Sequence, residues 1–271
     1  MSVLVVDVSS NNAHPIDYAA VKAAGVGGAI VKLTEGGAAT AYVNPFAAGD
    51  LAGFRGVGLP VAGYHFLHPA TPVVAQLTLL QHHLDAVGFV WVDSELDEGP
   101  WPGVATATRA MCEAIAGLGL STGLYSSPSF LSHLPGAPWG YPLWLADYGV
   151  ASPPGVPTLW QYTDAGSIAG ISGAVDLSRF DGTGAQLAAL FARHVPGPTT
   201  HQPHPRPLPE EEDMIWLDAD PNNEDAILVV PARGGWFGIA ADKLAYYRAN
   251  GVPEARSHIT KAVFDTLQKL G

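Results

Sequence analysis

The sequence has little positive charge, one cysteine and few charged residues overall. Lys and Arg together number 13 against 25 Asp and Glu, which gives a net charge of −12. Nucleic-acid binding depends on basic patches that neutralise phosphates, so this balance argues against a nucleic-acid partner. The single cysteine, Cys112, excludes a disulfide within the chain. It lies in an apolar helical segment, which predicts a buried and unreactive thiol.

Two further absences concern membranes and export. No apolar run reaches the roughly 18–20 residues that a membrane-spanning helix needs, so we expect no membrane partner. The first residues, Met1 to Asp7, have no basic region and run directly into an apolar strand. A secretory signal peptide has a different pattern. We therefore expect the protein to be made in the cytoplasm and to need another factor for release.

The most informative stretch is an apolar run, residues 87–92, that ends in two carboxylates, Asp93 and Glu95. Side chains alternate along a strand, so both acids point the same way, with Cα atoms about 6.6 Å apart at ~3.3 Å per residue. Such neighbours raise each other's pKa, so one can donate a proton while the other stays ionised. Cleavage of a glycosidic bond needs one protonated and one ionised carboxyl group. A solvated loop is the alternative, and the acids Asp97 and Glu98 that follow agree with it.

Hydrophobic periodicity predicts a succession of short strands, the first five separated by helices. The expected strands are residues 3–7, 29–33, 59–66, 87–92, 122–126, 142–147, 157–162 and 173–176. The expected helices are residues 17–24, part of 42–56, 72–87, 104–118 and 184–194. Alternating strands and helices indicate parallel strands joined by right-handed crossovers. The fold class predicted is therefore α/β, an irregular TIM-like (β/α) barrel.

The carboxyl ends of the predicted strands are rich in acids and aromatics. In a barrel of this kind, chemistry takes place at those ends. They carry Asp7, Glu35, Tyr64, His65, Asp93, Glu95, Tyr125, Asp147, Gln161 and Asp176. A barrel without a site would be expected to end its strands mainly in Gly, Ser, Asn and Thr. The pattern therefore indicates catalysis by carboxylates.

A Pro-rich segment divides the chain. Its prolines stand at alternate or near-alternate positions, which predicts a semi-extended linker. We predict a catalytic barrel at residues 1–194, the linker at residues 195–213 and a small α+β module at residues 214–271. In the module, the pattern predicts a hairpin of residues 226–230 and 235–239 and helices at about residues 242–250 and 257–270.

Several short segments, taken in order, also carry a family likeness. They are Val5–Ser9, Val31–Gly36, Gly63–Phe66, Asp93–Glu95, Gly123–Pro128, Leu143–Tyr148, Trp160–Tyr162 and Gly170–Leu177. Each is weak alone, but together and in register the chain resembles glycoside hydrolase family 25, the Chalaropsis-type lysozymes common in phage lysins. Residues 10–15 and the acidic residues 96–101 depart from the family pattern, and both would border the substrate groove.

The resemblance implies hydrolysis of the β-1,4 bond between N-acetylmuramic acid and N-acetylglucosamine in peptidoglycan. Glu95 would match the general acid and Asp93 the second catalytic carboxylate. Asp93 would either orient the substrate's 2-acetamido group as an internal nucleophile or act as a base for water. Asp7 and Asp176 would match the family's other active-site carboxylates and tune Glu95. Strand-end capping is the alternative for these two.

The expected substrate-binding residues are Tyr64, Tyr125, Trp144, Glu35, Asp147 and Gln161. The aromatics would stack on sugar rings, although for Trp144 a place in the core is an equal alternative. The polar members would form hydrogen bonds to the glycan. We expect His65 to pack or hydrogen-bond beneath the site. Carboxylate chemistry of this kind needs no metal or cofactor, and the histidines lack the spacing of metal ligands.

Two biological roles agree with this interpretation. The first is a phage endolysin, released to peptidoglycan glycan strands by a pore-forming holin in order to lyse the host. The second is a phage tail-associated protein that binds or loosens the wall with the same barrel. A protease or acyl transferase is disfavoured, since no nucleophile stands with His and Asp as a triad would require. The C-terminal aromatics either bind wall or, as we favour, form the core of that module; they are Trp236, Phe237, Tyr246 and Tyr247.

Overall fold

The chain separates into two compact units, Met1–Val195 and Pro196–Gly271. The structure, a computed structural model, describes residues 2–192, 215–218, 226–230, 235–239 and 256–258. The predicted linker, residues 195–213, lies outside these described residues.

The first unit is a barrel. Its strands are β1 (Ser2–Val8), β2 (Val26–Glu35), β3 (Tyr42–Val43), β4 (Val61–Phe66), β5 (Phe89–Asp93), β6 (Ser121–Ser126), β7 (Leu143–Ala146), β8 (Leu159–Gly166) and β9 (Val175–Asp181). They form a nine-stranded sheet in the order β1-β9-β8-β7-β6-β5-β4-β2-β3, and an additional pairing of β1 with β2 closes the barrel, with β3 attached outside the ring. The predicted α/β barrel is confirmed.

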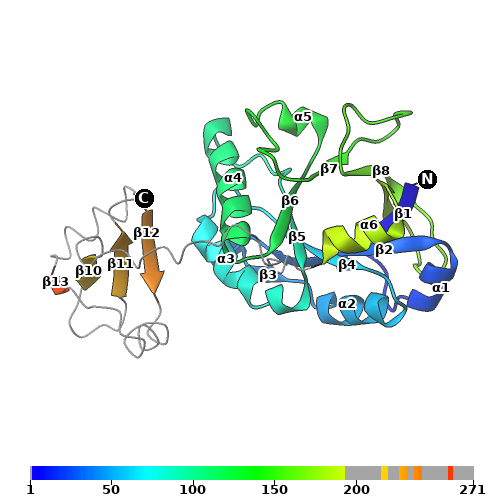
Figure 1. The fold of residues 1–271 in the computed structure, drawn as a ribbon, viewed down its shortest axis with the longest axis horizontal. Coiled ribbons are helices and arrows are strands. Elements are labelled where there is room, and N and C mark those ends of the chain that lie inside the picture. Colours follow the sequence, from blue (N-terminus) through cyan, green and yellow to red (C-terminus); the bar gives the residue numbers. More distant parts are fainter. Residues whose placement is uncertain (1, 193–214, 219–225, 231–234, 240–255, 259–271) are drawn as a thin grey trace, which may run out of the picture. The chain divides into compact units, whose positions relative to one another are not determined.

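Helices follow most of the early strands. They are α1 (Tyr18–Ala23), α2 (Ala47–Gly56), α3 (Val73–Gln81), α4 (Trp101–Gly117), α5 (Pro128–Leu131) and α6 (Gly184–Phe191), with 3-10 turns η1 (Ala38–Thr40) and η2 (Leu84–Ala86). The long helices lie on the outside of the barrel (Figure 1). The helix predicted over residues 72–87 is wrong in its length, because the chain turns after Gln81 and buries Leu84 from the separate turn η2.

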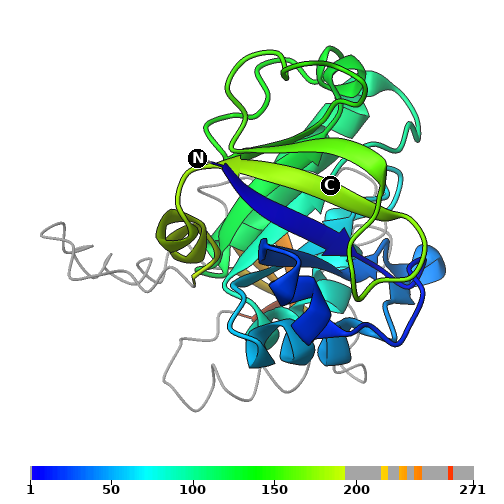
Figure 2. The same ribbon diagram turned by 90° about the vertical axis from the view of Figure 1, so that its right-hand side faces the viewer.

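The prediction that all barrel strands run parallel is wrong for β9. This strand is antiparallel to both of its neighbours, β1 and β8. A parallel strand needs a crossover of about a dozen residues or more, whereas the short loop at residues 167–174 suits an antiparallel return. Figure 2 shows β1 (dark blue) beside β9 (yellow-green), although the two strands come from opposite ends of this unit. The barrel is therefore mixed.

Alternation along the strands separates two buried layers. On β5, Val90 and Val92 belong to the layer that packs against the helices, while Phe89 and Trp91 belong to the cluster inside the barrel. Asp93 lies on the same face of β5 as Phe89 and Trp91, because side chains two residues apart on a strand share a face. The apolar interior of the barrel is thus capped at one end by a carboxylate.

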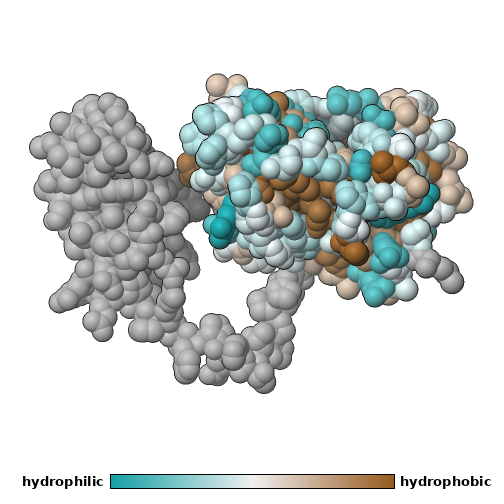
Figure 3. Space-filling model, turned by 90° about the horizontal axis from the view of Figure 1, so that it is seen from above, coloured by the Kyte–Doolittle hydropathy of each residue, from teal (hydrophilic) through white to brown (hydrophobic). Residues whose placement is uncertain are grey.

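The outer surface of the first unit is mixed in character. The space-filling view shows hydrophilic and hydrophobic residues interspersed over the visible face of the coloured part (Figure 3). Among the described residues, no helix combines the length and the apolar character that crossing a membrane would need.

The second unit contains a four-stranded sheet in the order β12-β11-β10-β13. Its strands are β10 (Ile215–Asp218), β11 (Ala226–Val230), β12 (Gly235–Ile239) and β13 (Arg256–His258). The predicted hairpin is confirmed, since β11 and β12 pair antiparallel. The helix expected over residues 257–270 is wrong at its start, where β13 instead pairs with β10. The rest of the predicted helices, including Tyr246 and Tyr247, lies outside the described residues.

The loop between β8 and β9 packs against the segment that begins α1, and this contact can be tested for its effect on stability. Gly170 in this loop has φ +98°, and a methyl group there would meet the backbone oxygen of Asp17 and the backbone nitrogen of Val21. We expect Gly170→Ala to lower the free energy of unfolding by about 2–4 kcal/mol, because left-handed strain and overpacking add. Urea unfolding measures the change.

Gly173→Ala is the matched control. Gly173 has φ +84° but no atom within 4 Å of an added Cβ, so it should cost only about 1–2 kcal/mol of backbone strain. Equal losses in the two variants would show that the contact with the α1 segment does not hold the loop.

Candidate active site

Acidic side chains gather where the strands end at one mouth of the barrel. Asp7 lies on β1, Asp176 on β9 and Asp93 at the end of β5, with Glu95 two residues beyond. Asp7 and Asp93 are buried, Asp176 is partly buried and Glu95 is exposed. The structure therefore brings the predicted catalytic carboxylates to one end of the barrel, and Glu95 is the most exposed of the four.

Asp7 and Asp176 form a proton-sharing pair. The antiparallel register of β1 and β9 places the two residues directly opposite each other. Burial, and then the charge of Asp176, raises the pKa of Asp7 well above its ordinary value. Burial raises the pKa of Asp176 to about 6, while the hydrogen bond with Asp7 opposes that rise. Two carboxyls in such contact ionise in separate steps, so Asp7 keeps its proton and donates a hydrogen bond to the carboxylate of Asp176.

Gln161 on β8 connects this pair to two tyrosines. Its Nε2 donates to Asp7 Oδ2 at 3.0 Å and to Asp176 Oδ2 at 3.4 Å. Its Oε1 accepts from Tyr125 at 2.8 Å and from Tyr148 at 2.6 Å. A glutamine amide has two donors and two acceptor positions, so the protein uses all of them. We predicted that Gln161 binds sugar directly; this side chain instead orients the acids, because nothing remains free for a ligand.

Asp93 differs from the other buried acid, because one of its oxygens is unpaired. Asp93 Oδ1 is buried and has no hydrogen-bond partner. Burial, and then the charge of Glu95, raises the pKa of Asp93, while Lys32 opposes the rise. Buried polar atoms are almost always satisfied. An unpaired acceptor at the mouth of the barrel is therefore suited to a donor on a bound ligand.

Glu95 has the properties of a proton donor. Its side chain reaches solvent, but the surrounding rim removes enough water from the carboxyl to raise its pKa, and the charge of Asp176 adds to this effect. A raised pKa keeps more of the carboxyl protonated near neutral pH, as a general acid requires. Exposure lets that proton reach a bound substrate.

A buried cation, Lys32, faces these acids, and the sequence analysis missed it. Lys32 on β2 is 9% exposed, and its Nζ lies 2.5 Å from Glu35 Oε2. The ammonium also lies 5.0 Å from the centre of the Phe66 ring and 5.9 Å from that of Tyr64. Its charge favours the ionised forms of Asp93 and Glu95. A single lysine within the apolar run Ala29–Leu33 was the available signal.

The predicted aromatic residues take different places. Trp144 is 2% exposed, and its indole N–H donates to Ser178 Oγ at 3.0 Å. Tyr125 is also buried and packs edge-on against Trp144. These two residues therefore support the site from within the core and do not line a groove, because no ring face is open. Tyr64 remains partly exposed, and the exposed Tyr148 is a rim aromatic that the prediction omitted.

The remaining predicted residues also separate. Hydrogen bonds from Lys32 and His68 overcome the effect of burial and lower the pKa of Glu35, so Glu35 belongs to the charged rim. Asp147 contributes only backbone contacts among the described residues, to Gln161 and Trp160. Its predicted role in sugar binding therefore has no side-chain contact to support it.

Two side chains near the site lie in the places expected of them. His65 is buried between Thr34 Oγ1 at 2.8 Å and Gln76 Oε1 at 3.0 Å, beneath the site as predicted. Burial lowers the pKa of His65 to about 4, so it is neutral near pH 7. Cys112 is fully buried, and burial raises the pKa of its thiol to about 12. The prediction that Cys112 is buried is confirmed.

Comparison with known proteins agrees with this geometry. The family model described as glycosyl hydrolases family 25 matches residues 6–171. Lysozyme M1 of Streptomyces globisporus is 28% identical over 205 residues, 65% of this chain and 67% of that protein. The autolytic lysozyme of Clostridium acetobutylicum is 28% identical over 176 residues, 61% of this chain and 52% of that protein. The alignment thus covers about half of the Clostridium protein.

Two solved structures resemble the barrel over nearly their whole length. A bacterial lysozyme from Streptomyces coelicolor matches with a TM-score of 0.59 and 26% identity, over 69% of this chain and 96% of that one. The catalytic domain of an endolysin from a Listeria monocytogenes bacteriophage matches with a TM-score of 0.60 and 22% identity, over 70% and 98%. The second likeness concerns the fold alone.

The raised pKa of Asp176 predicts a pH-dependent stability. The folded pKa of about 6 lies above the unfolded value of about 3.9, so the stabilisation is complete below pH ~4 and is lost as pH rises through 6. We expect Asp176→Asn to remove this loss and to be more stable than the parent at pH 7 by roughly 1–2 kcal/mol, after allowance for partial exposure. Denaturant unfolding at pH 4 and pH 7 measures the difference.

Asp181→Asn serves as the control, since Asp181 is an exposed acid at the other end of the same strand. Its substitution should leave the pH dependence of unfolding as in the parent. If Asp176→Asn shows the parent's pH dependence too, Asp176 does not titrate as described.

Proposed function

Because this chain belongs to glycosyl hydrolase family 25, we propose that it is an N-acetylmuramidase, a lysozyme. It hydrolyses the β-1,4 bond between N-acetylmuramic acid and N-acetylglucosamine in peptidoglycan. The observation that carries this proposal is the pairing of an exposed acid of raised pKa, Glu95, with a buried acid, Asp93, that has an unpaired oxygen. Glycoside hydrolysis uses two carboxyls in such different states.

The proposed reaction begins with the proton on Glu95. Glu95 protonates the glycosidic oxygen as the bond from the anomeric carbon to that oxygen breaks. Asp93 Oδ1 accepts the N–H of the 2-acetamido group, whose carbonyl oxygen then bonds to the anomeric carbon. Water next attacks this carbon as the bond from the carbon to the acetamido oxygen breaks, and the proton of the water passes to Glu95, which has become a base. We favour this role for Asp93 over a base for water, because its unpaired oxygen is suited to a donor that the bound substrate supplies.

The other charged residues set the states of this pair. The Asp7–Asp176 pair holds one negative charge near Glu95 and favours its protonated form. The positive charge of Lys32 acts in the opposite direction on Glu95. It also opposes the rise in the pKa of Asp93 and so favours the ionised form of Asp93. Gln161 holds Asp7 and Asp176 in place by hydrogen bonds to both. Fixed charges of this kind need no rearrangement during the reaction.

We also propose that the enzyme is a phage endolysin, made in the host cytoplasm and released to the wall by a holin. The fold shared with an endolysin catalytic domain supports this role. A tail-associated protein would use the same site. Analysis of purified phage particles for this protein separates the two roles, because only a tail-associated protein should remain in the virion.

Glu95→Gln should lower hydrolysis of purified peptidoglycan by about 10²–10⁴-fold, because the amide cannot deliver a proton. Asp93→Asn should also lose most of its activity, since the neutral amide cannot stabilise the positive charge that develops on the acetamido group. The release of reducing ends measures both variants. Asp97→Asn removes one charge from the same segment and should retain nearly full activity.

Cosedimentation with peptidoglycan accompanies the assay. Glu95→Gln should still bind, because the substitution keeps the size and polarity of the side chain. Activity of Glu95→Gln at the level of Asp97→Asn would overturn the assignment of the proton donor.

A further inference from the structure

We propose that His68 is a positioning residue that holds the segment carrying Glu95 in place. It does so by bridging Glu98 of that segment to Glu35 at the end of β2. The inference rests on the proposed function, because it concerns the placement of its proton donor.

The segment between β5 and α4 is fixed at both ends. At the first end, Ser94 donates its backbone N–H to Tyr125 O at 3.0 Å, and its hydroxyl lies 2.8 Å from Thr108 Oγ1. At the second end, the Glu98 carboxylate lies 3.1 Å from His68 Nδ1 and accepts the backbone N–H of Ala70 at 3.4 Å. Glu95 lies on the short span between these anchors, so both affect its position.

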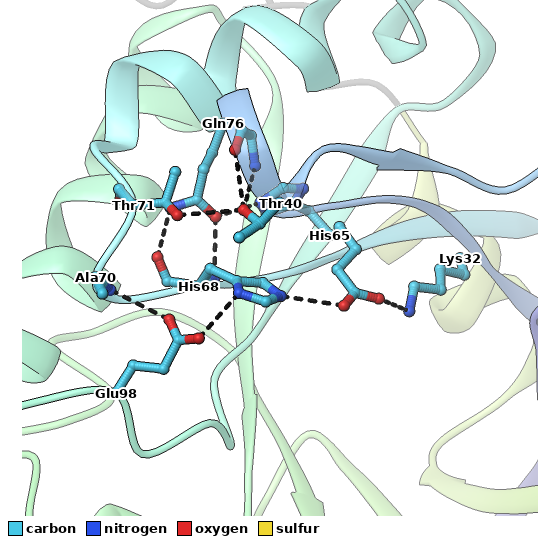
Figure 4. A network of polar contacts seen from close by, with 10 residues as sticks. Lys32, Thr40, His65, His68, Ala70, Thr71, Gln76 and Glu98 are labelled. Carbon is cyan, nitrogen blue, oxygen red and sulfur yellow. Dashed lines mark hydrogen bonds and ion pairs between the residues drawn. The ribbon is translucent and has the colours of Figure 1, made fainter.

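His68 contacts carboxylates through both of its ring nitrogens. Nδ1 faces Glu98, and Nε2 lies 3.0 Å from Glu35 Oε1. Ionised carboxylates only accept hydrogen bonds, so an imidazole that binds two of them must donate from both nitrogens and carry a positive charge. The charges then alternate along a chain from Lys32 through Glu35 and His68 to Glu98, as Figure 4 shows in part.

The charged surroundings of His68 are otherwise limited. Glu35 and Lys32 come from β2 and Glu98 comes from the segment. His65 on β4 is neutral, because burial lowers its pKa to about 4. The negative charges of Glu35 and Glu98 thus balance the positive charges of His68 and Lys32.

His68 is held rigidly by its own backbone. The buried Gln76 on α3 accepts the N–H of His68 at 3.0 Å and donates to the carbonyl oxygen of His68 at 2.9 Å (Figure 4). The same amide donates to Thr71 O at 2.9 Å. An anchor fixed in this way transmits its position to Glu98, whereas a mobile side chain would follow the loop.

A structural ion pair without effect on the chemistry is the competing explanation. Exposed pairs of this kind often contribute little. Here the side chain of His68 is 14% exposed and that of Glu98 is 29% exposed, and the chain of charges continues into the site through Lys32. A displacement of about 1 Å at a proton donor costs on the order of 10²-fold in rate. The bridge should therefore affect turnover.

The test compares His68→Ala, Glu98→Ala, the double variant and the control Asp181→Ala on purified peptidoglycan. We expect each of the first two to lower kcat by about 10–100-fold with KM changed less than about threefold, because substrate contacts remain while the acid is misplaced. The double variant should be no worse than either single one, since both remove the same bridge. Asp181→Ala should match the parent, because Asp181 is exposed and lies at the end of β9 away from the mouth of the barrel.

Amide hydrogen exchange of residues 94–100 gives a readout that does not depend on activity. The segment should exchange faster in His68→Ala and Glu98→Ala than in the parent and in Asp181→Ala. If His68→Ala fails to fold, Glu98→Gln replaces it, because this change keeps the acceptor for Ala70 but removes the charge that binds the imidazolium.

The outcomes separate the two proposals. Unchanged exchange, an unchanged kcat or multiplicative losses in the double variant would each overturn the positioning role. If the parent hydrolyses no peptidoglycan while exchange responds as expected, the proposed function fails and the bridge stands.

Discussion

The active site depends on the hydrogen bonds that Gln161 makes to Asp7 and Asp176. Carboxyls buried together repel each other when ionised, and burial alone already favours their neutral forms. One amide with all of its hydrogen-bonding positions occupied fixes the pair in a single arrangement with one shared proton. Tyr125 and Tyr148 complete this arrangement by donating to the amide oxygen. The geometry of the mouth therefore follows from a side chain that has no part in the chemistry.

The reversed strand β9 explains how this network arises. A parallel strand would have brought only its carboxyl end to the mouth, whereas β9 runs away from it and contributes its first residues. Asp176, near its start, lies opposite Asp7 near the end of β1. An antiparallel neighbour thus adds a carboxylate to the mouth without a further crossover helix. The same reversal lets a short loop, residues 167–174, close the barrel. This loop requires positive φ at Gly170 and Gly173.

The sequence could predict the barrel and the acids because both follow from local patterns. Alternation on β5 placed Asp93 and Glu95, and strand-end positions located Asp7 and Asp176. Pairing register is not local, so the opposition of Asp7 and Asp176 could not be read from spacing. For the same reason the sequence left the groove and the core as equal alternatives for Trp144, and the residues around it place it in the core. The position of Lys32 beside the acids and the contact of His68 with Glu98 also depend on which strands become neighbours. From the sequence alone, the acidic loop of residues 96–101 could equally be a solvated loop without a role.

Lys32 links the two charged groups of the mouth. On one side, its charge counters the rise in the pKa of Asp93 and of Glu95. On the other side, it binds Glu35, whose second oxygen contacts His68. The more firmly Glu35 is held by His68, the more fixed the ammonium is with respect to the acids. A partly buried ion pair of this kind is poor evidence for stability, because desolvation offsets much of its attraction. Its value here lies in placing a counter-charge at a set distance from two acids that must differ in protonation.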